Sequence, residues 1–290
     1  MSYLILQCGS VARGDSNSRS DVDLICIHDE SSTPINELKN KYEEITFYSV
    51  ETLIRMKSKG SLFITHLDID AKILDGNSEL RSVVSGFRPK ISDLKESIAT
   101  SSRFIQSLHW YPDSNLGQLW LLDVLYVSLR NIIYCHNALD GKYKFGFSEA
   151  IRAFGLNQEQ EALLLQVREG KYVFRNELKL EELAKPSYFE LNSLKNLVGL
   201  ICGLPFMLII GGVTEWNGVW RLDYWGERLL ERAIINSEAP NDGFRELLKD
   251  HNYNRRSLTG EMKQRIAVAQ QINTADPISD TLLASLQSVG

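Results

Sequence analysis

The sequence has few cysteines, no strong excess of either charge and no secretory signal before its first predicted strand. Its four cysteines are scattered singly among 290 residues, without the spacing of metal ligands: Cys8, Cys26, Cys135 and Cys202. We therefore expect reduced core residues in a cytoplasmic protein. The net charge of −5 gives no general attraction to nucleic acid, although it leaves room for a local basic patch.

The sequence also offers no convincing membrane span. One apolar run, residues 197–212, falls short of the roughly 20 residues that a spanning helix needs. It contains Pro205 and several glycines, which interrupt helices. We expect a buried helix that is broken at the proline, and no membrane partner.

The pattern of apolar residues changes after residue 88. Before that point, short apolar runs bounded by turn residues predict alternating strands and helices. Beyond it, apolar residues recur at helical spacing. The predicted helices cover residues 91–108, 116–139, 148–154, 158–172, 188–210, 221–235, 243–249 and 259–272. We therefore expect an α+β protein with a sheet domain (1–88), a helical bundle (89–240) and a helical extension (241–290).

Two acidic residues stand two positions apart at the start of a predicted second strand. Alternate side chains of a strand share a side, so Asp21 and Asp23 converge, and Val22 between them is expected to face the core. Like charges this close are costly without a cation between them. Mg²⁺ prefers oxygen ligands and binds through one or two carboxylates plus substrate phosphates. The pair therefore predicts a magnesium site.

The turn before that strand carries groups suited to phosphate. Gly9 lets the backbone approach a phosphate closely, and Ser10 offers a hydroxyl as well as its N–H. Arg13 adds a planar fork of donors. Together with the two acids, these residues predict a metal-bound nucleoside triphosphate.

The order Gly-Ser-x-Ala-Arg-Gly in residues 9–14, followed by Ser-Asp-x-Asp-Leu in residues 20–24, resembles the nucleotidyltransferase superfamily in its minimal and antibiotic-modifying branch. The resemblance implies a polymerase-beta-like fold with a short mixed sheet. It implies that Mg²⁺ or Mn²⁺ supports transfer of a nucleoside monophosphate, such as AMP, from an NTP to an acceptor hydroxyl, with release of pyrophosphate. The matching residues would be Gly9, Ser10, Arg13 and Ser20 at the nucleotide, and Asp21 and Asp23 as catalytic metal ligands.

The family adds a third carboxylate, which helps bind metal or takes the proton of the acceptor. In the strand-like run 44–48, Thr46 stands where the resemblance places that acid, and Glu44 shares its face. Asp68 and Asp70 follow in residues 61–70, and the position of Asp70 matches an acid of several family members. Glu44 and Asp70 are therefore both candidates for the third catalytic acid.

The helical half contains a second motif. Residues 130–136, Arg-Asn-Ile-Ile-Tyr-Cys-His, resemble the Arg-polar-(x)n-His motif of HEPN domains. These bundles accompany minimal nucleotidyltransferases in bacterial toxin–antitoxin and antiviral defence systems, and active members cleave RNA. Arg130 and His136 are thus candidates for an alternative RNase site. Residues six apart on an ideal helix lie about 120° apart, so the two do not share a face.

Basic and aromatic residues alternate around Lys171 and Arg175, which makes these two cations candidate phosphate contacts. The same pattern fits lysines that extend from a helix end. The acceptor stays open between a small molecule, a protein and a tRNA, and the chain could form a homodimer or bind a partner protein. Without a third acid at the metal, a nucleotide-binding regulatory or antitoxin-like module with weak catalysis is the alternative.

Overall fold

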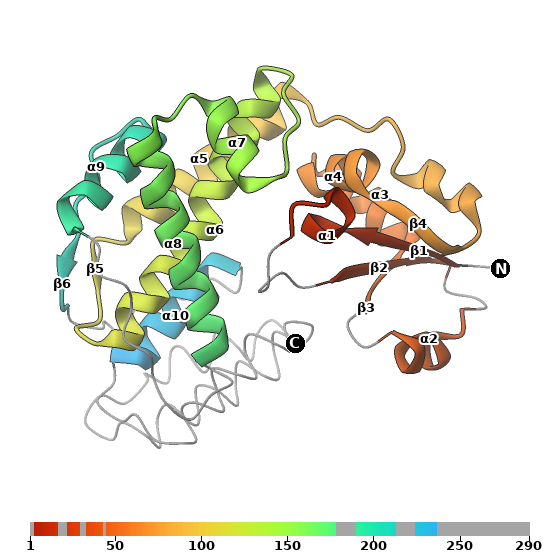
Figure 1. The fold of residues 1–290 in the computed structure, drawn as a ribbon, viewed down its shortest axis with the longest axis horizontal. Coiled ribbons are helices and arrows are strands. Elements are labelled where there is room, and N and C mark those ends of the chain that lie inside the picture. The colour runs from red at the N-terminus through yellow and green to blue at the C-terminus, as the bar shows by residue number, and fades with distance from the viewer. Residues whose placement is uncertain are drawn as a thin grey trace, which may run out of the picture. The chain divides into compact units, whose positions relative to one another are not determined.

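The computed structural model describes residues 3–16, 22–29, 33–42, 45–177, 190–212 and 224–236. They form an α+β protein in which helices predominate (Figure 1). Their contacts group the chain into two compact units, Met1–Ser102 with Arg130–Glu161, and Arg103–Leu129 with Ala162–Gly290. The boundary expected at residue 88 lies inside the first unit, because residues that follow it in the sequence belong to the same unit as the sheet.

The first unit is built on a four-stranded mixed sheet with the order β3-β2-β1-β4. Strand β1 (Tyr3–Cys8) lies between β2 (Asp23–His28) and β4 (Lys72–Gly76) and is antiparallel to both. Strand β3 (Ile45–Ser49) joins β2 in parallel. The expectation of a small mixed sheet followed by helices is therefore confirmed.

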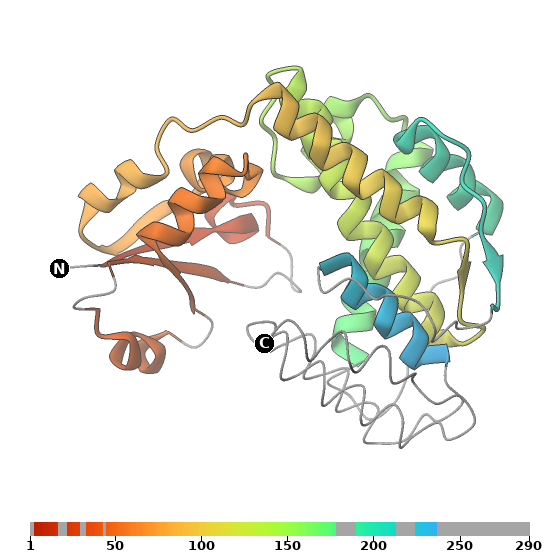
Figure 2. The same cartoon turned by 180° about the vertical axis from the view of Figure 1, so that it is seen from behind.

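Both faces of the central strands are buried, which explains their continuous apolar sequences. Leu4 and Leu6 point into one core, beneath α3 (Val50–Ser58) and α4 (Leu62–Asp70). Ile5 points the other way, toward α2 (Ile35–Lys41). Helices α3 and α4 thus cover one face of the sheet and α2 the other (Figure 1, Figure 2). Each fully buried leucine contributes about 1.5–3 kcal/mol to folding.

Two long helices, α5 (Ile91–Ser107) and α6 (Asn115–Leu139), contribute residues to both units, and α7 (Phe147–Phe154) completes the first. Helix α6 ends as its sequence predicts. Gly141 has a φ of 74°, a conformation that glycine adopts without strain, and the next N–H bonds back to the helix. The observed bounds of α5, α6 and α7 agree with the expected ones within one residue.

The second unit contains α8 (Gln158–Glu177), α9 (Leu191–Cys202) and α10 (Tyr224–Asn236). It also contains a parallel pair of short strands, β5 (Trp110–Tyr111) and β6 (Ile209–Ile210). The helices expected at 243–249 and 259–272, and the extension 241–290, lie outside the described residues.

The helix expected over residues 188–210 is wrong beyond Cys202. Gly203 adopts the left-handed conformation, with a φ of 69°, and its N–H bonds to Leu200. Pro205 follows and cannot continue a helix, so the chain runs on in extended form to β6. The apolar run is therefore broken, as expected, but at Gly203.

One helix among the described residues, α6, is long and apolar enough to cross a membrane by length and composition. Within the protein, 72% of its apolar window is buried. This burial is consistent with the core helix of a soluble protein. All four cysteines are free, and Cys8, Cys26 and Cys135 are buried.

Candidate active site at the end of the first strand

The pairing of β1 with β2 brings Gly9 against Asp23. Cys8 is the register partner of Asp23, so the residue after Cys8 meets the side chain of that acid. Gly9 begins α1 (Gly9–Arg13) with a φ of 75°, and a Cβ atom at this position would overlap the Asp23 carboxylate. Glycine is therefore required here for two reasons, its backbone conformation and the space that the acid occupies.

The rest of the predicted acidic pair is only partly described. Asp21, Ser20 and Glu44 lie outside the described residues, so the convergence of Asp21 with Asp23 stays a prediction. Val22 is 45% exposed, and the expectation that it faces the core is wrong. The reason is that the pairing of β2 begins at Asp23, one residue later, so Val22 has no strand partner among the described residues.

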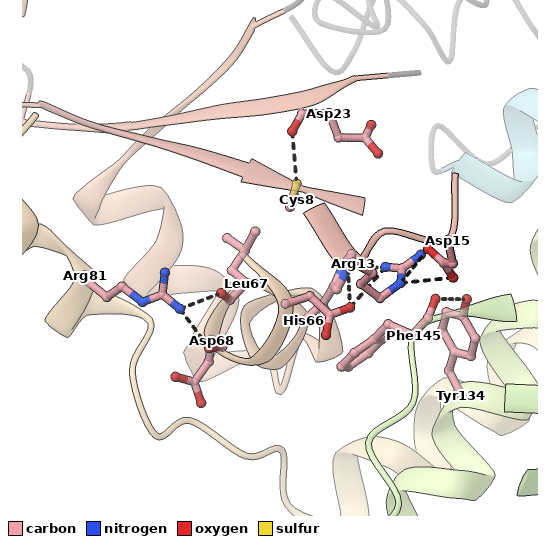
Figure 3. A network of polar contacts seen from close by, with 11 residues as sticks. Cys8, Arg13, Asp15, Asp23, His66, Leu67, Asp68, Arg81, Tyr134 and Phe145 are labelled. Atoms are coloured by element: carbon pink, nitrogen blue, oxygen red, sulfur yellow. Dashed lines mark hydrogen bonds and ion pairs between the residues drawn. The ribbon is translucent and has the colours of Figure 1, made fainter. Parts of the chain in front are cut away.

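Arg13, at the end of α1, is held between two acids and a histidine (Figure 3). Its Nε lies 3.2 Å from Oδ1 and 3.4 Å from Oδ2 of Asp15. Its Nη1 donates to Oδ2 of Asp70 over 3.0 Å and lies 3.3 Å from Nε2 of His66. Burial alone would lower the pKa of Arg13, but the hydrogen bonds and charges of Asp70 and Asp15 outweigh it and raise the pKa.

Asp70 is the last residue of α4 and stays ionised in this cluster. Its Oδ2 lies 3.3 Å from Nε2 of His66, one helical turn earlier, and only 11% of its side chain is exposed. Burial alone would raise the pKa of Asp70, but the contacts with His66 and Arg13 outweigh it and lower the pKa. Asp70 is therefore a paired carboxylate rather than a neutral acid.

Arg81 binds backbone carbonyls at the C-terminal end of α4. Its Nη1 donates to the carbonyl of Ala71 over 2.7 Å, and its Nη2 donates to the carbonyl of Asp68 over 2.9 Å. These carbonyls belong to the last turn of α4 and to the residue after it, where backbone acceptors lack helical partners. Figure 3 shows the hydrogen bond from Arg81 to the carbonyl of Asp68. Arg81 thereby holds the turn that carries Asp70.

The pKa of the Cys8 thiol depends on burial and on the charged groups at this end of β1. Burial, with smaller contributions from the charges of Asp23 and Asp70, raises the pKa of the thiol to about 12, and the charge of Arg13 opposes them. Asp23, Asp70 and Arg13 therefore all act on the same sulfur atom. Because the thiol is neutral and donates to the carbonyl of Asp23 over 3.5 Å, Cys8 is a structural residue.

The described charges at this end of β1 favour a cation over a free anion. Asp15 and Asp70 pair with the guanidinium of Arg13, and Asp23 adds a third carboxylate whose charge acts on the neighbouring thiol of Cys8. A triphosphate would be repelled by this excess of carboxylates unless a divalent cation came with it. Within the described part of the chain, no group of three or more His, Cys, Asp or Glu residues is arranged around one metal position.

The structure also places residues here that the sequence analysis did not select. His66 is one of them, and its spacing of four residues from Asp70 on one helix face was the signal available. The ring of Phe145 lies 4.7 Å from that of His66, and the hydroxyl of Tyr134 donates to the carbonyl of Phe145 over 2.7 Å. The loop after α6 thus packs on α4 beside Arg13.

The candidate phosphate contacts of the helical half belong to the second unit. Nζ of Lys171, on α8, lies 5.4 Å from the ring of Tyr126 and 4.8 Å from that of Tyr172. Arg175 lies on the same helix, but its side chain is outside the description. The role of both residues at a phosphate stays a prediction.

Arg130 and His136 contact different aromatic rings. The guanidinium carbon of Arg130 lies 6.0 Å from the ring centre of Tyr134. The ring of His136 lies 5.6 Å from that of Phe154, edge to face, and burial lowers the pKa of His136. This arrangement agrees with their separation on α6 and gives no specific support to an RNase site.

Comparison with known proteins gives no match to a family model, a curated protein or a solved structure. The function is therefore argued from the residues and their geometry.

Proposed function

We propose that the protein is a magnesium-dependent nucleotidyltransferase that moves a nucleoside monophosphate from an NTP to an acceptor hydroxyl. The observation that supports this most strongly is the exposed carboxylate of Asp23 lying against Gly9, at adjoining ends of β1 and β2. Because Gly9 has no side chain, a phosphate can come close to its backbone and bind the same cation as the neighbouring carboxylate of Asp23. The parallel addition of β3 beyond β2 agrees with the mixed sheet that the resemblance implies.

The residues of the proposed site have separate tasks. Gly9 and Ser10 receive the phosphates of the NTP, with ATP as the first substrate to test. Asp21 and Asp23 hold Mg²⁺, which offsets phosphate charge, and the all-oxygen donor set fits that ion. Arg13 stabilises the charge that develops on the departing pyrophosphate.

The proposed transfer is a substitution at phosphorus and needs no oxidant or reductant. The acceptor oxygen forms a bond to the α-phosphorus in line with the bond that breaks, and pyrophosphate leaves with the electron pair. The acceptor proton passes to a carboxylate, for which Glu44 is the other candidate that the sequence offers. In the sequence, Glu44 and Asp23 directly precede Ile45 and Leu24, which form the first residue pair between β3 and β2. Catalysis then rests on positioning and electrostatics.

A nucleotide-binding module with weak catalysis is the second candidate, and one observation favours it. Asp70, one of the two candidates for the third acid, is already engaged by Arg13 and His66. If Glu44 does not serve in its place, the nucleotide would bind without efficient transfer. Mg·ATP binding measured by calorimetry, together with no label transfer, would identify such a module.

The test uses the full-length protein, Mg²⁺, each α-³²P-labelled NTP and a cell lysate as the source of acceptors. Asp23→Asn neutralises the candidate metal ligand at one end of β2, and Asp29→Asn neutralises an exposed acid just past the other end. We expect Asp23→Asn to reduce transfer by about 100-fold, or about 2.7 kcal/mol of activation free energy. Asp29→Asn is the matched control and keeps the activity. Equal transfer by the wild type and Asp23→Asn would refute the metal assignment.

A further inference from the structure

Arg13 of α1 contacts Asp15 and, on α4, His66 and Asp70, an arrangement that the proposed transfer does not by itself explain. We propose that Asp70, together with His66, positions the Arg13 guanidinium for the nucleotide phosphates and does not bind the metal. This inference rests on the proposed function, because it assigns a role at the same site.

Arg13 is restrained on two of its three nitrogens. Asp15 accepts from Nε, and Asp70 accepts from Nη1, which His66 also contacts. Among the described residues, Nη2 has no hydrogen-bond partner, and 18% of the side chain is exposed. A guanidinium that is held at one edge and open at the other can meet a phosphate oxygen without first losing its rotational freedom.

The groups that restrain Arg13 are themselves fixed. Arg81 binds the carbonyls at the end of α4, which immobilises the turn that carries Asp70. The ring of Phe145 packs on His66, and Tyr134 holds the backbone of Phe145 (Figure 3). Such support around a binding group is what a positioning role requires.

The surroundings of Asp70 differ from those expected of a metal ligand. Its Oδ2 accepts from a full positive charge, and a metal ion on that oxygen would leave the partly buried Arg13 with Asp15 alone. Asp23, by contrast, is exposed, and its carboxylate lies against the backbone of Gly9. The two acids therefore have distinct roles, Asp23 at the cation and Asp70 behind the arginine.

A double-mutant cycle tests this assignment. The binding of Mg²⁺ with α,β-methylene-ATP is measured by calorimetry for the wild type, Arg13→Ala, Asp70→Ala and the double variant. We expect each single variant to bind about tenfold more weakly, as loss of one charge-assisted contact predicts. The double variant should bind no more weakly than Arg13→Ala, because Asp70 acts only through Arg13.

Two controls separate positioning from a general structural effect. Asp68→Ala removes another acid of α4, whose Oδ2 lies 2.7 Å from Nη1 of Arg88. This variant should leave the nucleotide affinity unchanged. Asp70→Asn keeps an oxygen acceptor for Arg13 and serves where the alanine variant does not fold. It should lose less affinity than Asp70→Ala.

The magnesium dependence of binding distinguishes the two roles of Asp70. The Mg²⁺ concentration for half-maximal binding should rise in Asp23→Asn and stay at the wild-type value in Asp70→Ala. Additive losses in the cycle, or a higher Mg²⁺ requirement in Asp70→Ala, overturn the inference and leave the proposed function intact. Absence of nucleotide binding by the wild-type protein overturns both.

Discussion

Each compact unit contains an arginine that two carboxylates bind, and the two clusters differ in exposure. In the second unit, Arg228 donates to Asp123 and to Glu231 of its own helix, and the side chains of Arg228 and Asp123 are both 0% exposed. In the first unit, the side chain of Arg13 is 18% exposed, and Arg13 ends the short helix α1 that Gly9 begins after β1. Full burial closes the Arg228 cluster to ligands, whereas partial exposure leaves the Arg13 cluster accessible to a ligand.

The comparison predicts that the largest effect on stability comes from the buried cluster. Asp123→Ala leaves Arg228 buried with one partner fewer, and we expect it to lower the free energy of unfolding by about 3–5 kcal/mol. Urea unfolding followed by circular dichroism measures this change. Replacing all three charged residues, as D123L/R228M/E231L, should recover most of the loss because no buried charge remains unpaired. A loss below about 1 kcal/mol in Asp123→Ala would contradict the comparison.

In the Arg13 cluster, a substitution at Gly9 should weaken nucleotide binding, whereas a matched substitution that only strains the backbone should not. Gly9→Ala places a methyl group on the Asp23 carboxylate and strains a positive φ, so we expect nucleotide affinity to fall at least about tenfold. Gly14→Ala is the matched control. Its φ of 84° gives similar strain, but no atom of the described residues lies within 4 Å of the added carbon. Both variants should lose about 1–2 kcal/mol of stability, and equal loss of nucleotide binding in the two would refute the role of Gly9.

Low pH should abolish the contribution of Asp70 to the stability of the folded protein. The folded protein holds the pKa of this carboxyl below its ordinary value, so its ion pairs stabilise the fold above about pH 4. Their contribution is lost as the pH falls through the folded-state pKa. The unfolding free energies of the wild type and Asp70→Asn should therefore differ at pH 7 and converge toward pH 2. A difference that does not change with pH would show that charge is not what Asp70 contributes.

The smallest effect is expected at the loop that packs on His66. Tyr134→Phe removes one hydrogen bond to the carbonyl of Phe145 and should cost about 0.5–1.5 kcal/mol of stability. Nucleotide affinity should change by no more than about twofold, since Arg81 still holds the end of α4. A loss of affinity well above about twofold would show that Arg81 alone does not keep Arg13 in position when this hydrogen bond is removed.

Local sequence signals predict the elements that local interactions define. Strands β1, β2 and β3 follow from apolar runs between turn residues, and the end of α6 follows from Gly141, whereas β4 was not predicted. The same reasoning failed where one residue overrode a periodic pattern, as Gly203 did at the end of α9. It also failed at Val22, where alternation was assumed to extend beyond the paired strand.

The candidate site was only partly predictable for a related reason. Gly9, Arg13 and Asp23 lie within 15 positions of one another, so strand and turn rules connect them. The partners of Arg13 on α4 are 53 and 57 residues away, and only the packing of α4 near α1 reveals them. The pairing of Asp123 with Arg228 spans 105 residues and has no local signal at all.

Transfer of α-³²P label by the intact protein in Mg²⁺ tests the central claim most directly. The account predicts that an acceptor becomes labelled with the wild type and with Asp29→Asn, and that labelling is lost with Asp23→Asn. Undiminished labelling by Asp23→Asn, or no binding of any Mg·NTP by the wild type, would contradict it.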